Sequence, residues 1–297
     1  MAHWRQRTVS LLLSGVVTMV IQSLARAGEE AMITAVASKT SGDYVRLKLS
    51  DGSYAPETYA FGKGGFWSGM HDDSIDKLKF IDVTRTIAGP LANQNYAPSK
   101  DPGKTKLLVM LYWGSTTVPP PISGSALFGN LQAAETNLQI AMASGNRELI
   151  IAAKDQVDFA EEALQSEYRL RNQADWRNAW MLGYDSKMEE TGMFDHTVFQ
   201  YRRDEVINDI EENRYFVVLM AYDFQLQWKQ KKHKLLWETR FSIQEHRNDF
   251  KLALPTMAQE ASRYFGQDSH GLVRRPLPEG HVTLGEPKVL EYEPEKK

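Results

Sequence analysis

The chain contains no cysteine among its 297 residues. This absence excludes a cysteine nucleophile, a stabilising disulfide and a lipid attached through a cysteine. A chain of this length can bury a core large enough to fold without such links. The fold must therefore depend on core burial alone.

Recognisable catalytic motifs are also missing. The sequence has no GxSxG, HExxH or phosphate-loop pattern, and its seven histidines include no pair at an i, i+4 ligand spacing. A net charge of −3 gives no field that would favour nucleic acid or an anionic membrane as a partner. We therefore predict no catalytic residue, no metal site and no cofactor.

The N-terminus has the pattern of a secretory signal peptide. Arg5 and Arg7 precede a short apolar run, which ends at small residues, Ala25 and Ala27, before Gly28 and two glutamates. This order predicts cleavage after Ala27. The alternative is an uncleaved anchor helix, because the run approaches the length that spans a bilayer. With cleavage, we expect a periplasmic or secreted protein with no integral membrane span and no lipid anchor.

The order of strand-like and helix-like segments predicts an α+β fold. Alternating runs at 31–61 indicate strands, apolar residues at helical spacing follow over 75–93, and the run KLLVMLYWG suits a central strand covered on both faces. We expect a small mixed or antiparallel sheet with helices packed on one face, in the order β-α-β-(helical insertion)-β-β-α.

The same pattern divides the chain into five parts. They are a signal peptide at 1–27, the first part of the α/β domain at 28–118, a helical insertion at 119–212, the second part of the domain at 213–266 and an extended C-terminal tail at 267–297. The insertion reads as an antiparallel helical hairpin that turns at Ser144–Asn146. The first expected apolar stripe is Phe128, Leu131, Leu138 and Met142, and the second is Leu149, Ala153, Val157, Ala160, Leu164 and Tyr168. Trp176 with Trp180 suggest a packed helix seam.

The segment 213–244 predicts a β-hairpin. In the first strand the even-numbered residues from Phe216 to Trp228 are all apolar, whereas the second strand carries Trp237 and Phe241 at odd numbers. If both sets share a face, Tyr222 lies opposite Phe241, and the lysine cluster at 229–234 becomes the turn.

Several segments resemble a family of bacterial envelope lipoproteins that share a domain of unknown function. The matching phrases are TYAF, SIDKLKFIDVTRTIAGPLANQNY, KLLVMLYWG, and YFVVLMAYDF with KLLWETRFSI, in which Asp223 and Trp237 fill family positions. The resemblance implies a small α/β domain like those of the TolB N-terminal domain and the curli-secretion lipoprotein, and an envelope location. The chain departs from the family in lacking the lipid-bearing cysteine, in a longer hairpin and in the helical insertion.

The candidate ligand-binding residues lie mainly after the third strand-like run. GKGGFWSG reads as a glycine-rich loop whose Phe66 and Trp67 either pack on the body or grip a peptide or glycan. In HDDSID, His71, Asp72 and Asp73 could hold a divalent cation, or the two acids could favour the N-terminus of the following helix. Asp223 is an acid in an apolar strand, which suggests a hydrogen-bonded structural role.

These observations favour an exported, non-catalytic binding or assembly module of the bacterial envelope. The expected partner is an envelope protein or a cell-wall component, with the helical insertion as its interface. One alternative is a cell-wall or glycan-acting hydrolase, or a metal-dependent enzyme, with a site near 67–76. Another is a binding module for a small apolar ligand held between the sheet and the helical insertion.

Overall fold

The computed structural model describes residues 33–69, 71–184, 209–246 and 248–276. The predicted cleavage site at Ala25, Ala27 and Gly28 lies outside these ranges, as does most of the predicted C-terminal tail. Residues 33–275 belong to one compact unit, which includes the helical insertion. Within the described ranges no helix is long and apolar enough to span a membrane.

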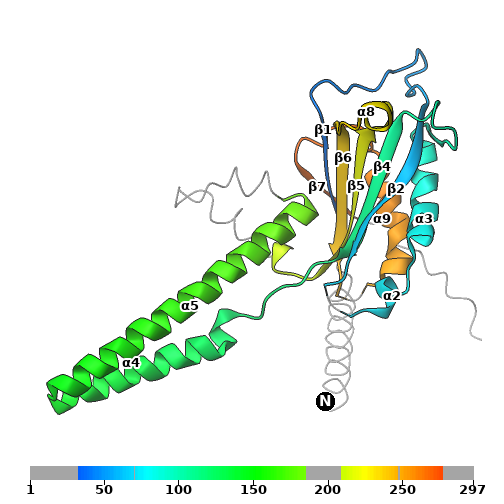
Figure 1. Ribbon diagram of the computed structural model, residues 1–297. Coiled ribbons are helices and arrows are strands. Elements are labelled where there is room, and N and C mark those ends of the chain that lie inside the picture. The colour runs from blue at the N-terminus through cyan, green and yellow to red at the C-terminus, as the bar shows by residue number, and fades with distance from the viewer. Residues whose placement is uncertain (1–32, 70, 185–208, 247, 277–297) are drawn as a thin grey trace, which may run out of the picture. The chain divides into compact units, whose positions relative to one another are not determined.

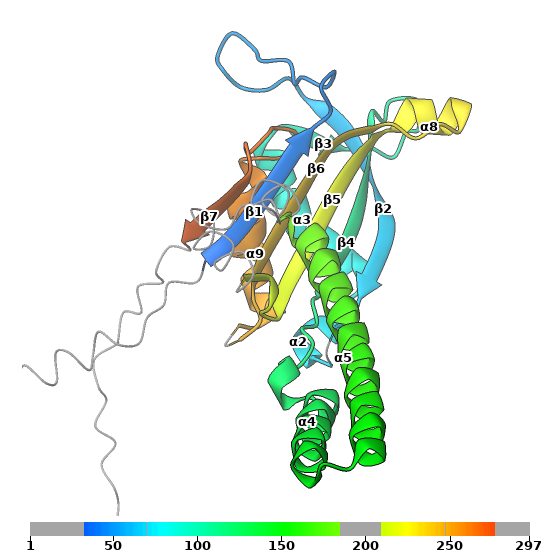
Figure 2. The ribbon, with the colours of Figure 1, turned by 90° about the vertical axis from the view of Figure 1, so that its left-hand side faces the viewer.

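The described residues contain one mixed sheet of seven strands, in the order β3-β2-β4-β5-β6-β1-β7 (Figure 2). The bounds are β1 Ile33–Thr40, β2 Glu57–Trp67, β3 Tyr96–Pro98, β4 Leu107–Ser115, β5 Arg214–Asp223, β6 Leu235–Gln244 and β7 Leu272–Pro276. β2 runs parallel to β3 and β4, whereas the pairs β4–β5, β5–β6 and β6–β1 are antiparallel. The predicted α+β class with a mixed sheet is confirmed.

Three helices lie against one face of the sheet, which we call the helix-covered face (Figure 1). They are α2 Asp73–Asp76, α3 Phe80–Asn93 and α9 Phe250–Ser262. Trp237 of β6 is fully buried here and stacks on Phe265 with ring centroids 6.0 Å apart. Tyr215 of β5 meets Phe250 of α9 at 5.4 Å. Buried aromatic pairs of this kind contribute through both area and ring contact, so this face carries the main core.

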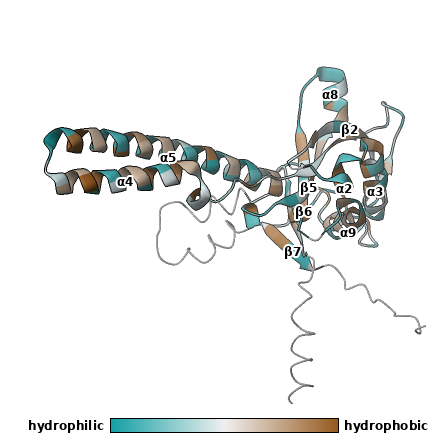
Figure 3. Cartoon of the chain, turned by 90° about the horizontal axis from the view of Figure 1, so that it is seen from below, coloured by the Kyte–Doolittle hydropathy of each residue, from teal (hydrophilic) through white to brown (hydrophobic). Residues whose placement is uncertain are grey.

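The helical insertion forms α4 Ala126–Ser144 and α5 Arg147–Leu182, which lie side by side (Figure 1). Gly145 has φ 67° and makes the turn between them. The buried residues along the contact of the pair are mostly alanines spaced one heptad apart, with a leucine four residues further on, as in a coiled-coil seam: Ala134, Ala141, Ala153, Ala160 and Leu164. Figure 3 shows apolar segments recurring along both helices. The predicted helical insertion is confirmed.

The residues predicted for the seam were partly wrong. Met142, Leu149 and Tyr168 are exposed, and so are Trp176 and Trp180. Ala153, Ala160 and Leu164 of the predicted second stripe are buried, so this stripe is right in its middle and wrong at its ends. In α4 the small residues Ala134 and Ala141 occupy the contact line and let the two helices approach closely.

The predicted register of the β5–β6 hairpin was also wrong. Trp237 pairs with Ala221 and Phe241 pairs with Val217, so the odd-numbered side of β5 shares the face of Trp237. The Asp223 carboxylate accepts a hydrogen bond from the Leu226 backbone N–H at 2.9 Å and begins a short helix, α8 Phe224–Gln230. Phe224, Leu226 and Trp228 therefore belong to a helix and not to the strand. The register prediction relied on these three residues, because β5 itself is apolar on both faces and its alternation does not distinguish them.

The expected strand around YVRLKLS is a loop with a single bridge between Lys48 and Tyr54. The expected burial of its apolar residues is reversed, because Val45 and Leu47 are exposed while Arg46 is buried. The Arg46 guanidinium lies between the Tyr54 and Tyr96 rings, 4.3 Å and 4.1 Å from their centroids. The Arg46 guanidinium also donates a hydrogen bond to the Gln94 carbonyl oxygen at 2.6 Å, and Leu49 and Ala55 make backbone hydrogen bonds across the loop. This loop is therefore held by buried Arg46 and local turn hydrogen bonds rather than by an extended strand ladder.

Candidate functional site

The glycine-rich stretch is the end of strand β2 rather than the predicted loop. Gly62 and Gly64 leave room for side chains of β4, because a Cβ at Gly62 would lie 2.3 Å from the Met110 sulfur, and one at Gly64 would lie 2.6 Å from the Tyr112 ring. Met110 and Tyr112 therefore lie over the backbone of β2. Glycine in a strand often marks such a close approach or a bulge, and both occur here.

The bulge between Lys63 and Gly65 decides where the next two aromatic side chains point. Beyond it Phe66 pairs with Trp113, and their rings lie 5.6 Å apart on the helix-covered face. Trp67 falls on the opposite face, where the Arg177 guanidinium of α5 lies 5.7 Å from its ring. The extra residue thus re-aims Trp67 toward α5.

The C-terminal end of α5 packs on this second face of the sheet. Ala179 and Leu182 are buried in one cluster with Ala35 of β1 and Phe216 of β5. Gly183 ends the helix with φ 82°, and a Cβ there would lie 2.5 Å from the Cβ of Ala37. Glycine is therefore needed both for the backbone conformation and for the close approach to β1.

A groove of about 550 Å³ lies between this end of α5 and the sheet. Its aromatic walls are Trp67, Tyr112 and Trp180, and the side chains of β5 that line it are Phe216, Val218 and Met220. Trp67 is 48% exposed and Trp180 is 51% exposed, so both rings present apolar surface to solvent. Apolar grooves of this size with few polar groups are typical of ligand sites.

Trp180 is held in place by a buried ion pair beside the groove. The Arg240 guanidinium lies 4.6 Å from the Trp180 ring centroid. Its two terminal nitrogens contact the two carboxylate oxygens of Glu238 at 3.0 Å and 3.2 Å. This bidentate geometry fixes the guanidinium plane, and the plane in turn supports the indole.

The predicted acidic cluster does not converge on a site. His71 Nδ1 lies 2.6 Å from Asp76, while Asp73 pairs with Lys77 at 2.7 Å and both His71 and Asp73 are exposed. Asp72 turns toward the body and accepts a hydrogen bond from the Tyr215 hydroxyl. Among the described residues no group of three or more His, Asp or Glu side chains could hold a metal ion.

Asp72 instead caps α2. Its side chain accepts hydrogen bonds from the Ser74 backbone N–H at 2.7 Å and the Ser74 hydroxyl at 3.1 Å. Burial opposes ionisation of Asp72, but the hydrogen bonds from Tyr215 and Ser74 outweigh it and lower the pKa of the carboxyl. Asp223 has the same kind of role at the start of α8, so both acids have structural partners.

Of the predicted ligand-binding residues, the structure brings Phe66 and Trp67 to the groove and leaves His71, Asp72, Asp73 and Asp223 out of its lining. The sequence analysis missed Arg177, Trp180 and Tyr112. A heptad count places Arg177 and Trp180 outside the seam that runs through Ala153, Ala160 and Ala174, but it gives no sign that they line a groove.

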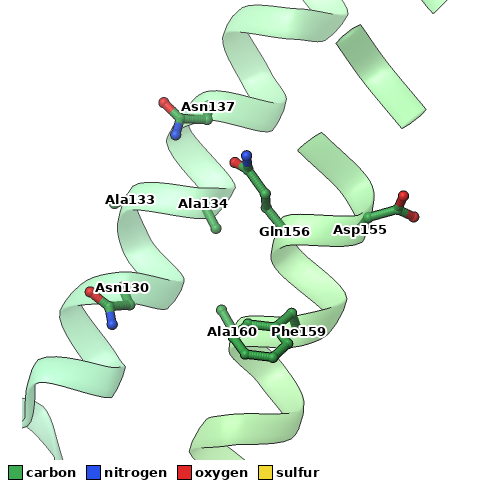
Figure 4. A pocket seen from close by; sticks show the side chains of 8 residues that line it. All are labelled: Asn130, Ala133, Ala134, Asn137, Asp155, Gln156, Phe159 and Ala160. Atoms are coloured by element: carbon green, nitrogen blue, oxygen red, sulfur yellow. The ribbon is translucent and has the colours of Figure 1, made fainter. Parts of the chain in front are cut away.

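A second hollow lies between α4 and α5 (Figure 4). Its volume is about 410 Å³, and amide side chains of both helices line it together with alanines and Phe159. Phe159 is 76% exposed. This hollow lacks the aromatic walls of the sheet groove, which is therefore the stronger candidate site.

Comparisons with known proteins give no family. No family model matches the chain, and no curated protein matches it. A solved structure of a PDZ domain protein from Parabacteroides distasonis is similar over 82% of this chain, with 10% sequence identity and a TM-score of 0.37. The match covers 39% of that protein's chain. The resemblance to the envelope lipoprotein domain therefore stays a prediction.

Proposed function

We propose that this protein is a non-catalytic binding protein of the bacterial envelope that holds a small apolar ligand in the groove between the sheet and α5. One observation carries the proposal, namely two tryptophans on different elements, each about half exposed, that line one apolar groove of about 550 Å³. Filling the groove would remove their rings from water, which is the main driving force for apolar ligands.

The surrounding structure holds both tryptophans of the groove in place. The position of the Trp67 side chain depends on the bulge between Lys63 and Gly65. It also depends on Gly114, because a Cβ there would lie 2.0 Å from the Trp67 carbonyl oxygen. Trp180 rests against the guanidinium of Arg240, which Glu238 fixes. Groups held before the ligand arrives lose little freedom on binding, so the arrangement favours affinity.

A hydrolytic or metal-dependent reaction near 67–76 receives no support from the geometry. The acids of that segment diverge, and each has a partner in the fold, with Asp72 capping α2 and Asp73 pairing with Lys77. The envelope location rests on the predicted signal peptide and on the resemblance to envelope lipoproteins.

A titration with a neutral apolar fluorophore, N-phenyl-1-naphthylamine, tests the proposal on the chain that begins at Gly28. We expect saturable enhancement of its emission. Trp67→Ala or Trp180→Ala should weaken binding by about tenfold, since each removes an aromatic wall. Trp228→Ala is the matched control, because Trp228 is a partly exposed tryptophan on α8 outside the groove. Saturable binding that both groove variants leave unchanged would contradict the proposal.

The helix pair supports a second candidate function, the binding of another envelope component. Large apolar side chains are exposed on both helices: Ile140, Met142, Leu149, Ile151, Phe159 and Leu170. Apolar surface gathered on one element is typical of interaction sites. A photo-crosslinking residue in place of Phe159 should trap one defined envelope protein in cells, and one in place of exposed Lys154 should trap it less. Absence of a defined product would remove this candidate.

A further inference from the structure

We infer that the ligand of the groove is a single-chain amphiphile whose carboxylate pairs with Arg177. The inference rests on the proposed function and adds the chemistry of the ligand's polar end. Among the described residues that line the groove, Arg177 alone carries a charge, and the others are aromatic, aliphatic, methionine or glycine. The groove therefore presents one cation at the side of an otherwise apolar surface.

Arg177 differs from Arg171 and Arg240 in having no acidic partner among the residues that the structure describes. Arg240 is paired with Glu238, and Arg171, six residues earlier on α5, contacts Glu211 at 3.0 Å. No described carboxylate lies within ion-pair distance of Arg177, and no described group accepts a hydrogen bond from it. A guanidinium left in this state has its full set of N–H donors available for a planar anion.

The position of Arg177 suits an anionic head group. Its guanidinium lies 5.7 Å from the Trp67 ring, so the indole face holds the cation at the groove. Trp180 follows at the i+3 position on the same helix and also lines the groove. A carboxylate on Arg177 therefore leaves an attached alkyl chain beside Trp180 and over Val218 and Met220.

A carboxylate fits better than a bulkier head group. The guanidinium fork matches the two oxygens of a carboxylate in one plane, and one cation balances its single charge. The groove volume, about 550 Å³, falls in the range that small ligands fill. We therefore assign a free fatty acid, or another single-chain acyl carboxylate, as the occupant.

Competition against N-phenyl-1-naphthylamine tests the inference, with dodecanoate, dodecanol and dodecyl phosphate as competitors below their micelle-forming concentrations. We expect dodecanoate to displace the fluorophore at about tenfold lower concentration than dodecanol, because hydrogen bonds to a charged group are strong. Arg177→Gln should abolish this preference and leave dodecanol unchanged. Arg169→Gln, at an exposed arginine of α5 outside the groove lining, should keep the preference.

The outcomes separate the two claims. Equal displacement by dodecanoate and dodecanol would overturn the inference and leave the apolar-ligand proposal standing. Stronger displacement by dodecyl phosphate than by dodecanoate would also overturn it, in favour of a phosphate head group. If the fluorophore does not bind at all, the proposed function fails first.

Discussion

The α/β body and the helix pair differ in what they bury. The body encloses large aromatic side chains, among them Tyr59, Trp237, Phe241 and Phe265, all nearly inaccessible to solvent. The pair α4–α5 encloses mainly alanines and leaves larger apolar side chains outside, as Ile140 and Phe159 show. Since stabilisation follows the apolar area removed from water, the body should hold most of the free energy of folding and the helix pair much less.

The groove lies where these two regions meet. One wall belongs to the strongly packed sheet, and the other is the last part of α5, which the body holds through Leu182 and Ala179. The two walls can therefore stay in place even if the distant part of the helix pair opens. Stability that varies along one chain in this way is common, and hydrogen exchange can measure it.

The largest expected effect is the loss of an aromatic from the body. Trp237→Ala should lower the free energy of unfolding by about 3–5 kcal/mol, since Trp237 is fully buried and stacks on Phe265. Urea unfolding measures the change. Trp228→Ala on α8 should stay within about 0.5 kcal/mol of the parent. Equal losses for the two variants would contradict the account of the core.

A smaller and local effect is expected in the helix pair. Leu164→Ala should cost about 2 kcal/mol, the low end for a buried leucine, because the seam lies close to solvent. Hydrogen exchange should show faster exchange along α4 and the facing part of α5, with β4–β6 still protected. Equal loss of protection in the strands would show that body and helix pair unfold as one unit.

Two glycine substitutions should act in opposite directions. Gly114→Ala places a Cβ against the Trp67 carbonyl oxygen and should cost about 1–3 kcal/mol. Gly129→Ala, in the exposed part of α4 with open space around it, should stabilise by about 0.5–1 kcal/mol through helix propensity. Thermal unfolding of both variants measures the two signs, and a stabilising Gly114→Ala would show that the β2–β4 contact is looser than described.

The smallest expected effect concerns acid. The pKa of Asp72 is lower in the folded chain than its usual value, so its contribution to stability is present above about pH 3.9 and is lost as pH falls through the folded pKa. Asp72→Asn keeps an acceptor for the Ser74 N–H but loses the charge, and should cost about 0.5 kcal/mol or less at neutral pH and little near pH 2.

Exposed Asp158 provides the control for this pH dependence. Asp158→Asn should follow the parent curve of unfolding free energy against pH. If Asp72→Asn and Asp158→Asn give the same curve, the hydrogen bond between Tyr215 and Asp72 contributes no stability.

The sequence allowed the fold class to be predicted because its signals are local. KLLVMLYWG is apolar at nearly every position and forms the interior strand β4, and a turn at Gly145 separates two helices. The register of β5 could not be predicted in the same way, because both of its faces are buried and parity carries no information there. Asp223 was recognised as structural, but its role as a helix cap was missed.

Only half of the candidate site was visible in the sequence. Phe66 and Trp67 stood out as aromatics among glycines, yet a single bulge decides which of the two rings points toward α5. Arg177 and Trp180 are more than a hundred residues further along and meet Trp67 only through tertiary packing. No local pattern encodes such a meeting, so the groove itself could not be predicted.

The most direct test of the central claim is quenching of tryptophan emission by 2-bromododecanoate, whose bromine lies beside the carboxylate and quenches rings that it contacts. We predict saturable quenching of the chain that begins at Gly28, its loss in a Trp67→Phe, Trp180→Phe double variant, and its retention in Trp228→Phe. Unchanged quenching in the double variant, or quenching that never saturates, would contradict a ligand site between the sheet and α5.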